Sequence, residues 1–402
     1  MTTPPPPGTR EWRAAVAALH AGLDQAHYGS IEQVPTATNR FAFPLEWSNL
    51  RAAITGKGRR LMEHTVSPTF HRARFRKRHP TQERLFGLFF LGEATARARV
   101  SKALDSIPDA PALEELVELG ILADQERRLR STLRFVPLGG DLFVTDPPDR
   151  SIPGFTYLGR DSAVLSDLLR SALRGRSFER ALDLCCGCGV QALAVSHHAG
   201  SVEGSDINPR AVAFAELNAK LNGKAPSVSF RVADLASGAA PPFDLIVANP
   251  PYVWMPDSER AANLDGFGGA FGLEIVGKIL AELDCLLAPH GEAHLVAESP
   301  VLDGTPLLPR IAAEFLGETN IGASLAPLWY SVHRHRAAFQ RRGGSSYNIY
   351  YHLVASRDLP PGIRIQDLRW PSRLAYGTYV RMAARAFAKP RGKRVPNPGA
   401  SP

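Results

Sequence analysis

The most specific chemistry in the sequence lies in Asn249-Pro250-Pro251-Tyr252. The motif follows an apolar run, 244–248, that we expect to be a buried strand. Because the prolines fix the backbone and withdraw N–H donors, the amide oxygen of Asn249 and the carbonyl of Pro250 can face one NH2 group. The ring of Tyr252 is suited to stacking on a planar substrate. The motif therefore predicts a site for an amide or an exocyclic amino group.

A second signal is a loop of small residues between a predicted strand and a predicted helix. The loop contains Cys185, Gly187 and Gly189, and it follows the acidic residue Asp183. Small residues allow a ligand to approach the backbone, and a helix N-terminus offers free N–H groups. The dinucleotide fingerprint needs three spaced glycines for a pyrophosphate. A loop after an acid instead suits a cofactor with a cationic amino-acid end.

Two further acids follow predicted strands at the same edge of the sheet. Asp206, followed by Ile207, comes about twenty residues after the loop, the spacing at which an acid accepts hydrogen bonds from ribose hydroxyls. Asp234, followed by Leu235, ends the next strand and can accept from the exocyclic amine of adenine. These residues predict a nucleoside-binding edge.

These motifs fall where short apolar runs alternate with helical patterns. Such alternation indicates an α/β fold, in which a parallel sheet carries helices on both faces and the ligand lies at the carboxyl ends of the strands. We expect strands over 180–185, 202–206, 227–232, 244–248, 292–297 and 347–354, and helices over 189–199, 209–221, 274–287 and 306–316.

Residues 180–298 resemble the class I S-adenosylmethionine-dependent methyltransferases, in the N-methylating "methyltransferase small domain" branch that carries Asn-Pro-Pro-Tyr. The resemblance extends to RNA amino-group N-methyltransferases and to release-factor glutamine N-methyltransferases, which place a glycine-rich segment like 265–273 after that motif. It implies a Rossmann-like, seven-stranded sheet with the last strand antiparallel, and 347–354 as that strand or its neighbour. One departure is Cys185, which stands at the first glycine of the family's loop.

The resemblance implies an enzyme that transfers a methyl group from S-adenosylmethionine to an amide or exocyclic amino nitrogen. The acceptor would be a protein glutamine, an RNA base or a small molecule. Catalysis is assigned to Asn249, Pro250, Pro251 and Tyr252. The cofactor is assigned to Asp183, Cys185, Gly187, Gly189, Asp206, Ile207, Asp234, Leu235 and Asn249.

Composition and patterning divide the chain into four parts. We expect a disordered Pro-rich N-terminus over 1–9, a mainly helical domain over 10–150, the methyltransferase domain over 155–383 and a basic disordered tail over 384–402. The helical domain begins with Trp12, Ala15, Leu19 and Leu23 at helical spacing. This domain is longer than the helical bundle of the glutamine methyltransferases.

The helical domain also has the element order of a winged helix-turn-helix. Its third helix carries Glu114, Glu115 and Glu118, which would repel phosphates. We therefore favour a scaffold or substrate-presenting role for this domain over sequence-specific binding of DNA. The pattern consists of helices over 82–91, 94–105 and 111–120, then strands over 129–136 and 141–144 around Gly139-Gly140.

The chain carries 47 Lys and Arg against 39 Asp and Glu, a net charge of +8. This excess favours anionic partners, and the basic stretches 70–79 and 334–342 are the candidate RNA contacts. Solvated charge is the simpler interpretation. An alternative function, from another class, is a nucleic-acid-binding regulator whose methyltransferase-like domain senses the cofactor.

Other functional classes are disfavoured. No apolar run approaches the ~18 residues of a membrane span, and the N-terminus lacks the features of a signal peptide. Three of the four cysteines are Cys185, Cys186 and Cys188. They form no disulfide framework, so we expect reduced thiols in a cytoplasm. The cluster also lacks the paired spacing of a zinc site, and we expect no metal.

Overall fold

The computed structural model describes residues 8–26, 28, 84–125, 127–147, 149, 151–255, 257–260, 263–302, 305–332 and 344–366. The basic stretches 70–79 and 334–342 and the predicted tail 384–402 lie outside these residues, as does most of 1–9. None of the helices in the described ranges has the length and apolar character that a membrane crossing requires.

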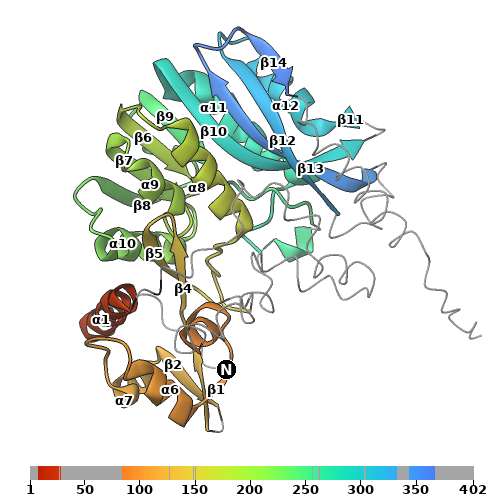
Figure 1. Ribbon diagram of the computed structural model, residues 1–402. Coiled ribbons are helices and arrows are strands. Elements are labelled where there is room, and N and C mark those ends of the chain that lie inside the picture. Colours follow the sequence, from red (N-terminus) through yellow and green to blue (C-terminus); the bar gives the residue numbers. More distant parts are fainter. Residues whose placement is uncertain are drawn as a thin grey trace, which may run out of the picture.

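A central sheet dominates the second half of the chain (Figure 1). Its strands are β6 (Phe178–Leu184), β7 (Ala199–Asp206), β8 (Val228–Val232), β9 (Phe243–Ala248), β10 (Leu287–Leu302), β11 (Thr305–Pro306), β12 (Gly322–Val332), β13 (Gly344–Ser356) and β14 (Gly362–Ile365). Seven of them lie in the order β8-β7-β6-β9-β10-β13-β12.

The strand directions match the predicted Rossmann-like sheet. The strands from β8 to β10 are mutually parallel, whereas β13 runs antiparallel to both β10 and β12. Residues 347–354 lie in β13 and are therefore the predicted antiparallel strand. Two strands extend the predicted sheet, because β14 pairs with β12 and the short β11 pairs with β10.

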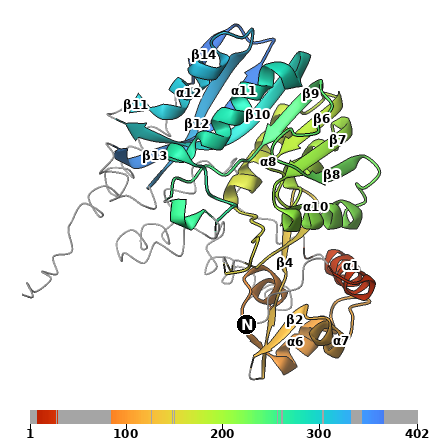
Figure 2. The same ribbon diagram turned by 180° about the vertical axis from the view of Figure 1, so that it is seen from behind.

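Helices cover both faces of the sheet (Figure 2). They are α8 (Arg160–Ala172), α9 (Val190–Val195), α10 (Pro209–Leu221), α11 (Glu274–Leu286) and α12 (Leu307–Leu316). Ala181 and Val247 pack in one core with α8 and α9, whereas their neighbours Leu182 and Ile246 pack in another with α11 and α12. This alternation follows from the pleat of the strands, which directs successive side chains to opposite faces.

Four of the helices and strands named above were not predicted, namely α8, β11, β12 and β14. The helix α8 had a signal, because Leu165, Leu169 and Leu173 recur at helical spacing and all three are buried. Strand β12 contains Pro327, where its pairing with β13 shifts register. A proline inside an apolar run argues against a strand, so the sequence pattern was misleading there.

Ahead of the sheet, the described residues form a small unit with the arrangement of a winged helix. Its helices are the π-helix η3 (Phe86–Phe90), α6 (Arg97–Leu104) and α7 (Leu113–Glu118), and its strands are β1 (Thr95–Ala96), β2 (Leu122–Gln125) and β3 (Arg128–Ser131). The strands lie in the order β1-β3-β2. The hairpin of this motif is therefore β2–β3 and not the predicted one.

The predicted hairpin around Gly139-Gly140 is present. It packs against α10 and is not part of the winged-helix arrangement. Its strands are β4 (Arg134–Leu138) and β5 (Asp141–Thr145), so the predicted strand 129–136 is in fact parts of two strands. The edge of β5 lies on α10, where Asn218 and Asn222 stand one turn apart. Each amide donates to and accepts from one residue of β5, Val144 and Leu142 respectively, at 2.7–3.1 Å. The two side chains thus replace a neighbouring strand.

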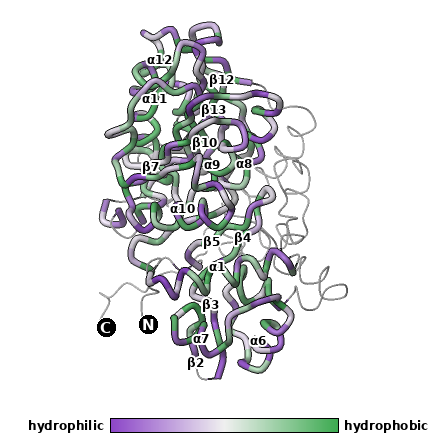
Figure 3. The backbone as a smooth tube through the Cα atoms, turned by 90° about the vertical axis from the view of Figure 1, so that its left-hand side faces the viewer, coloured by the Kyte–Doolittle hydropathy of each residue, from purple (hydrophilic) through white to green (hydrophobic). Residues whose placement is uncertain are grey.

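The first helix packs on the same hairpin. In α1 (Arg10–Gln25) the predicted apolar residues are all buried, and His20 Nε2 lies 2.9 Å from the carbonyl oxygen of Leu142. Figure 3 shows α1, β4 and β5 between the unit that contains α6 and α7 and the sheet domain. The described part of the N-terminal region is therefore packed against the sheet domain through α10.

A buried cluster of titratable groups joins β10 to β13. His294 Nδ1 lies 3.1 Å from His352 Nε2, and His294 Nε2 lies 3.1 Å from Glu292, which also binds Arg176 through two hydrogen bonds. Burial, assisted by His294, lowers the pKa of His352 to about 3.

This cluster should make stability depend on pH. The unfolded chain binds a proton at His352 near pH ~6.5, whereas the folded chain does not until about pH 3. The free energy of unfolding should therefore fall by about 1.4 kcal/mol for each pH unit below that unfolded pKa. In His352→Gln, urea unfolding between pH 4 and 7 should lose this dependence. The exposed His290→Gln is the control, and equal pH profiles for both variants would contradict the assignment.

Candidate active site

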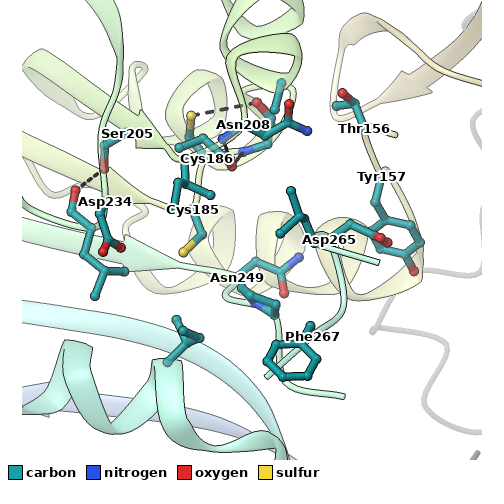
Figure 4. A pocket seen from close by; sticks show the side chains of 18 of the residues that line it. Thr156, Tyr157, Cys185, Cys186, Ser205, Asn208, Asp234, Asn249, Asp265 and Phe267 are labelled. Atoms are coloured by element: carbon teal, nitrogen blue, oxygen red, sulfur yellow. Dashed lines mark hydrogen bonds between the residues drawn. The ribbon is translucent and has the colours of Figure 1, made fainter. Parts of the chain in front are cut away.

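A cleft opens at the carboxyl ends of β6, β7, β8 and β9, where the predicted ligand should lie (Figure 4). Residues beyond the predicted motifs also contribute, namely 155–157 ahead of α8, Ser162 in α8 and several residues of 264–275. The predicted residues that line the cleft are Cys185, Gly187, Asp206, Ile207, Asp234, Leu235, Asn249 and Pro251.

The loop after β6 has a backbone that favours small residues. Cys185, Gly187 and Gly189 have φ angles of 57°, 53° and 86°, in the left-handed region that glycine favours. Cys185 thus keeps a glycine-like backbone, at a cost of roughly 1–2 kcal/mol for a residue with a Cβ. A Cβ at Gly189 would lie 3.1 Å from Phe230, so this glycine serves close packing beneath the cleft and does not line it.

Asp183 lies beneath the loop and does not line the cleft. Its side chain is fully buried, and Oδ2 accepts a hydrogen bond from the backbone N–H of Ala192 in α9 at 2.8 Å. Burial raises the pKa of this carboxyl, while the bond from Ala192 opposes the shift. The strand alternation explains the placement, because Asp183 shares the face of Ala181 that α9 covers. The contact seen for Asp183 is therefore structural.

Asp206 connects the loop to the start of the next helix. Its Oδ2 accepts from the backbone N–H of Gly187 at 2.9 Å, and its Oδ1 accepts from that of Asn208 at 2.8 Å. Burial raises the pKa of this carboxyl, and the two N–H groups lower it. Each oxygen keeps a further lone pair for a hydroxyl. Beside it, Ile207 is 58% exposed and offers an apolar surface.

The turn that follows β8 contributes Asp234 and Leu235 to the cleft. Asp234 is exposed, whereas Leu235 is buried and has a φ of 48°. The hydroxyl of Ser205 donates to the carbonyl oxygen of Leu235 at 2.7 Å and holds this turn against β7 (Figure 4). The turn therefore presents Asp234 to the cleft from a fixed backbone.

Asn249 lies in the cleft between Cys185 and Phe267 (Figure 4). Its Nδ2 donates to Ser162 Oγ at 3.1 Å. Its Oδ1 is buried and has no hydrogen-bond partner in the described residues. Because a buried acceptor without a partner costs ~1–3 kcal/mol, an N–H donor from a ligand would be stabilised here.

Tyr252 and Pro250 are not among the residues that line the cleft, and the stacking of Tyr252 on a substrate stays a prediction. The hydroxyl of Tyr252 donates to Asp161 Oδ2 at 2.6 Å, and its ring packs edge-on against Tyr350 with centroids 5.4 Å apart. Burial raises the pKa of this phenol, with Asp161 adding to the shift, so the hydroxyl stays protonated. Tyr252 therefore holds the motif in place from outside the cleft.

A wall formed by residues 155–157 was not predicted. The backbone N–H of Thr156 donates to Asp146 Oδ2 at 2.9 Å, and its carbonyl accepts from the hydroxyl of Thr145 at 2.9 Å. Asp146 is also bound by Arg210 through two hydrogen bonds, and this ion pair is almost wholly buried. No local motif marks these residues, since the contacts join the end of β5 to Thr156 and to Arg210, which lies in α10.

The residues of the cleft fit S-adenosylmethionine. Asp206 has lone pairs for two hydroxyls, Ile207 offers an apolar surface to a base, and the loop from Cys185 exposes its backbone beside them. The unpartnered Oδ1 of Asn249 lies on the same cleft. In the part of the chain that the structure describes, no group of three or more His, Cys, Asp or Glu side chains could hold a metal ion.

Comparison with known proteins agrees with this geometry. Residues 155–308 match the family model of the methyltransferase small domain, which confirms the resemblance predicted from the motifs. A ribosomal protein uL3 glutamine methyltransferase of Xanthomonas campestris pv. campestris is 35% identical over 150 residues, covering 33% of this chain and 48% of that protein.

A release factor glutamine methyltransferase of Rhodospirillum rubrum is 39% identical over 122 residues, covering 28% of this chain and 38% of that protein. These matches span about half of the relatives' own length or less. Among solved structures, wild-type Trm5b from Pyrococcus abyssi overlaps 60% of this chain and 67% of its own, with 18% identity and a TM-score of 0.39.

The left-handed backbone at Cys185 can be tested by stability. Cys185→Ala keeps the cost of the positive φ, whereas Cys185→Gly removes it. The glycine variant should therefore be about 1 kcal/mol more stable than the alanine variant in urea unfolding. Cys186, whose φ is not positive, is the matched control. There the order should reverse, with glycine roughly 0.5–1 kcal/mol less stable than alanine. The same order at both positions would contradict this account of the loop.

Proposed function

We propose that the chain is an S-adenosylmethionine-dependent N-methyltransferase whose acceptor is the side-chain amide of a glutamine in a protein. The observation that carries the proposal is the buried, unpartnered Oδ1 of Asn249 on a cleft that fits the cofactor. Both curated relatives named above are glutamine methyltransferases. Their similarity supports the amide as the acceptor, ahead of an RNA base or a small molecule.

Some residues of the cleft would bind the cofactor, and Asn249 would take part in transfer of the methyl group. Bound here, S-adenosylmethionine supplies an electrophilic methyl group on a sulfonium. Asp206 would accept from the ribose hydroxyls, with Ile207 against the base and Asp234 near its amino group. The loop from Cys185 to Gly187 would hold the amino-acid end.

Asn249 is the residue that acts on the acceptor. An amide nitrogen is a poor nucleophile because its lone pair is delocalised into the carbonyl. A hydrogen bond from its N–H to Asn249 Oδ1 orients the nitrogen and stabilises the positive charge that develops on it during transfer. The amide of Asn249 is not a base at neutral pH, so the surplus proton leaves to water afterwards.

The proposal is tested by incubating the chain with S-adenosylmethionine and the release factors and uL3 protein of its own organism. Mass spectrometry should find one added methyl group on a glutamine side chain. Total RNA from the same cells is the parallel acceptor, and transfer to RNA alone would overturn the glutamine assignment. Cofactor binding without transfer to any acceptor would favour the alternative, a regulator that senses the cofactor.

Asp206 should control affinity for the cofactor. Asp206→Ala removes the acceptors for two hydroxyls, which should weaken binding of S-adenosylmethionine by ~1–3 kcal/mol in calorimetry. Asp358→Ala removes a carboxylate whose side chain is 63% exposed, in the turn that follows β13, and this variant should bind the cofactor as the wild type does. An unchanged affinity in Asp206→Ala would exclude this residue from the cofactor site.

Asn249 should control turnover rather than cofactor affinity. Asn249→Ala removes one preorganised partner of the acceptor nitrogen, a loss that typically lowers kcat by ~10²–10³. The dissociation constant of S-adenosylmethionine for the same variant should stay near that of the wild type. Near-normal turnover in Asn249→Ala would rule out nitrogen methylation at this site.

A further inference from the structure

The side chain of Asn249 must be held in one of two orientations. A primary amide presents a donor, Nδ2, on one side and an acceptor, Oδ1, on the other, and the two differ little in shape. Only Oδ1 can accept a hydrogen bond from the N–H of the substrate amide that receives the methyl group. An amide rotated by half a turn would present a donor to a donor, so the site needs a group that fixes the orientation.

Ser162 is the residue that the Asn249 amide contacts in the orientation seen in the structure. Its Oγ accepts from Asn249 Nδ2 at 3.1 Å, which leaves Oδ1 as the unpartnered atom. Ser162 is 5% exposed and lies in the first turn of α8, a helix that the sequence motifs did not include. A hydroxyl can accept or donate, so this contact holds the Asn249 side chain in place in the orientation that the structure shows.

Ser162 is itself fixed by its backbone. Its N–H donates to Asp161 Oδ1 at 3.0 Å, and its carbonyl accepts from Gln191 Nε2 of α9 at 2.9 Å. The other oxygen of Asp161 accepts from the Tyr252 hydroxyl at 2.6 Å. The first turn of α8 therefore contacts both polar side chains of the motif, Asn249 through Ser162 and Tyr252 through Asp161.

We propose that Ser162 is a positioning residue that holds Asn249 with Oδ1 available to the methyl acceptor. The inference rests on the proposed function of Asn249 and adds the residue through which that function is set. Ser162 acts through Asn249, so its effect should vanish when Asn249 is absent.

The first experiment measures turnover of the full chain with the glutamine substrate. Ser162→Ala should lower kcat by about 10-fold or more, because a misplaced partner in the transition state is costly. Cofactor affinity should change little. Ser162→Thr keeps the hydroxyl and should retain most of the turnover. Ser166→Ala, one turn further along α8, is the matched control for loss of a buried serine hydroxyl.

A double-mutant cycle separates positioning from direct contact. In an Asn249→Ala background, Ser162→Ala should have no further effect on kcat. An equal additional loss in that background would overturn the proposal, since the hydroxyl would then act independently of Asn249. A normal kcat in Ser162→Ala would overturn it as well.

A second readout does not need activity. Nuclear magnetic resonance of the side-chain amide of Asn249 should show slower proton exchange in the wild type and Ser162→Thr than in Ser162→Ala. Equal exchange in all three would contradict the contact. If the wild type transfers no methyl group to any acceptor, the proposed function fails, and this exchange measurement still decides whether Ser162 holds Asn249.

Discussion

The candidate site depends on one carboxylate, that of Asp206, which holds two separate backbones together. One oxygen accepts from Gly187 in the loop after β6, and the other accepts from Asn208 at the start of α10. Asn208 in turn caps α10 by accepting from the backbone N–H of Arg210. The cleft therefore has a fixed floor before any ligand binds, and the same carboxylate remains able to accept two hydroxyls.

The N-terminal region supports the wall of the cleft at 155–157 through Thr145 and Asp146, although it contributes no residue to the lining of the cleft. Asn218 and Asn222 of α10 hold β5 as a strand would, and the chain then leaves β5 through Asp146. The buried pair of Asp146 and Arg210 fixes Thr156 beside the loop. Because breaking a buried ion pair leaves a charge uncompensated, this wall is strongly coupled to α10.

The sequence predicted the parts of the site that follow directly from strand ends. A strand of known direction places Asp206, Asp234 and Asn249 at one edge, so their meeting required only the order of the strands. The contact of the Tyr252 hydroxyl with Asp161 was not predicted, because nothing in the local sequence indicates it.

The unpredicted parts share one cause. Ser162, Thr156 and Asp146 lie far from the motifs in sequence, and each reaches the site through contacts between distant segments. Such contacts cannot be predicted from short sequence motifs. The spacing of Leu165, Leu169 and Leu173 was sufficient to predict α8, although not that its first turn faces Asn249.

The most direct test of the central claim is a crystal structure of the chain with S-adenosylhomocysteine, the product of transfer. The account predicts both ribose hydroxyls on Asp206, the base beside Ile207 and the sulfur on the side of the cleft that holds Asn249. A ribose bound away from Asp206, or a sulfur separated from Asn249 by the loop at Cys185, would contradict it.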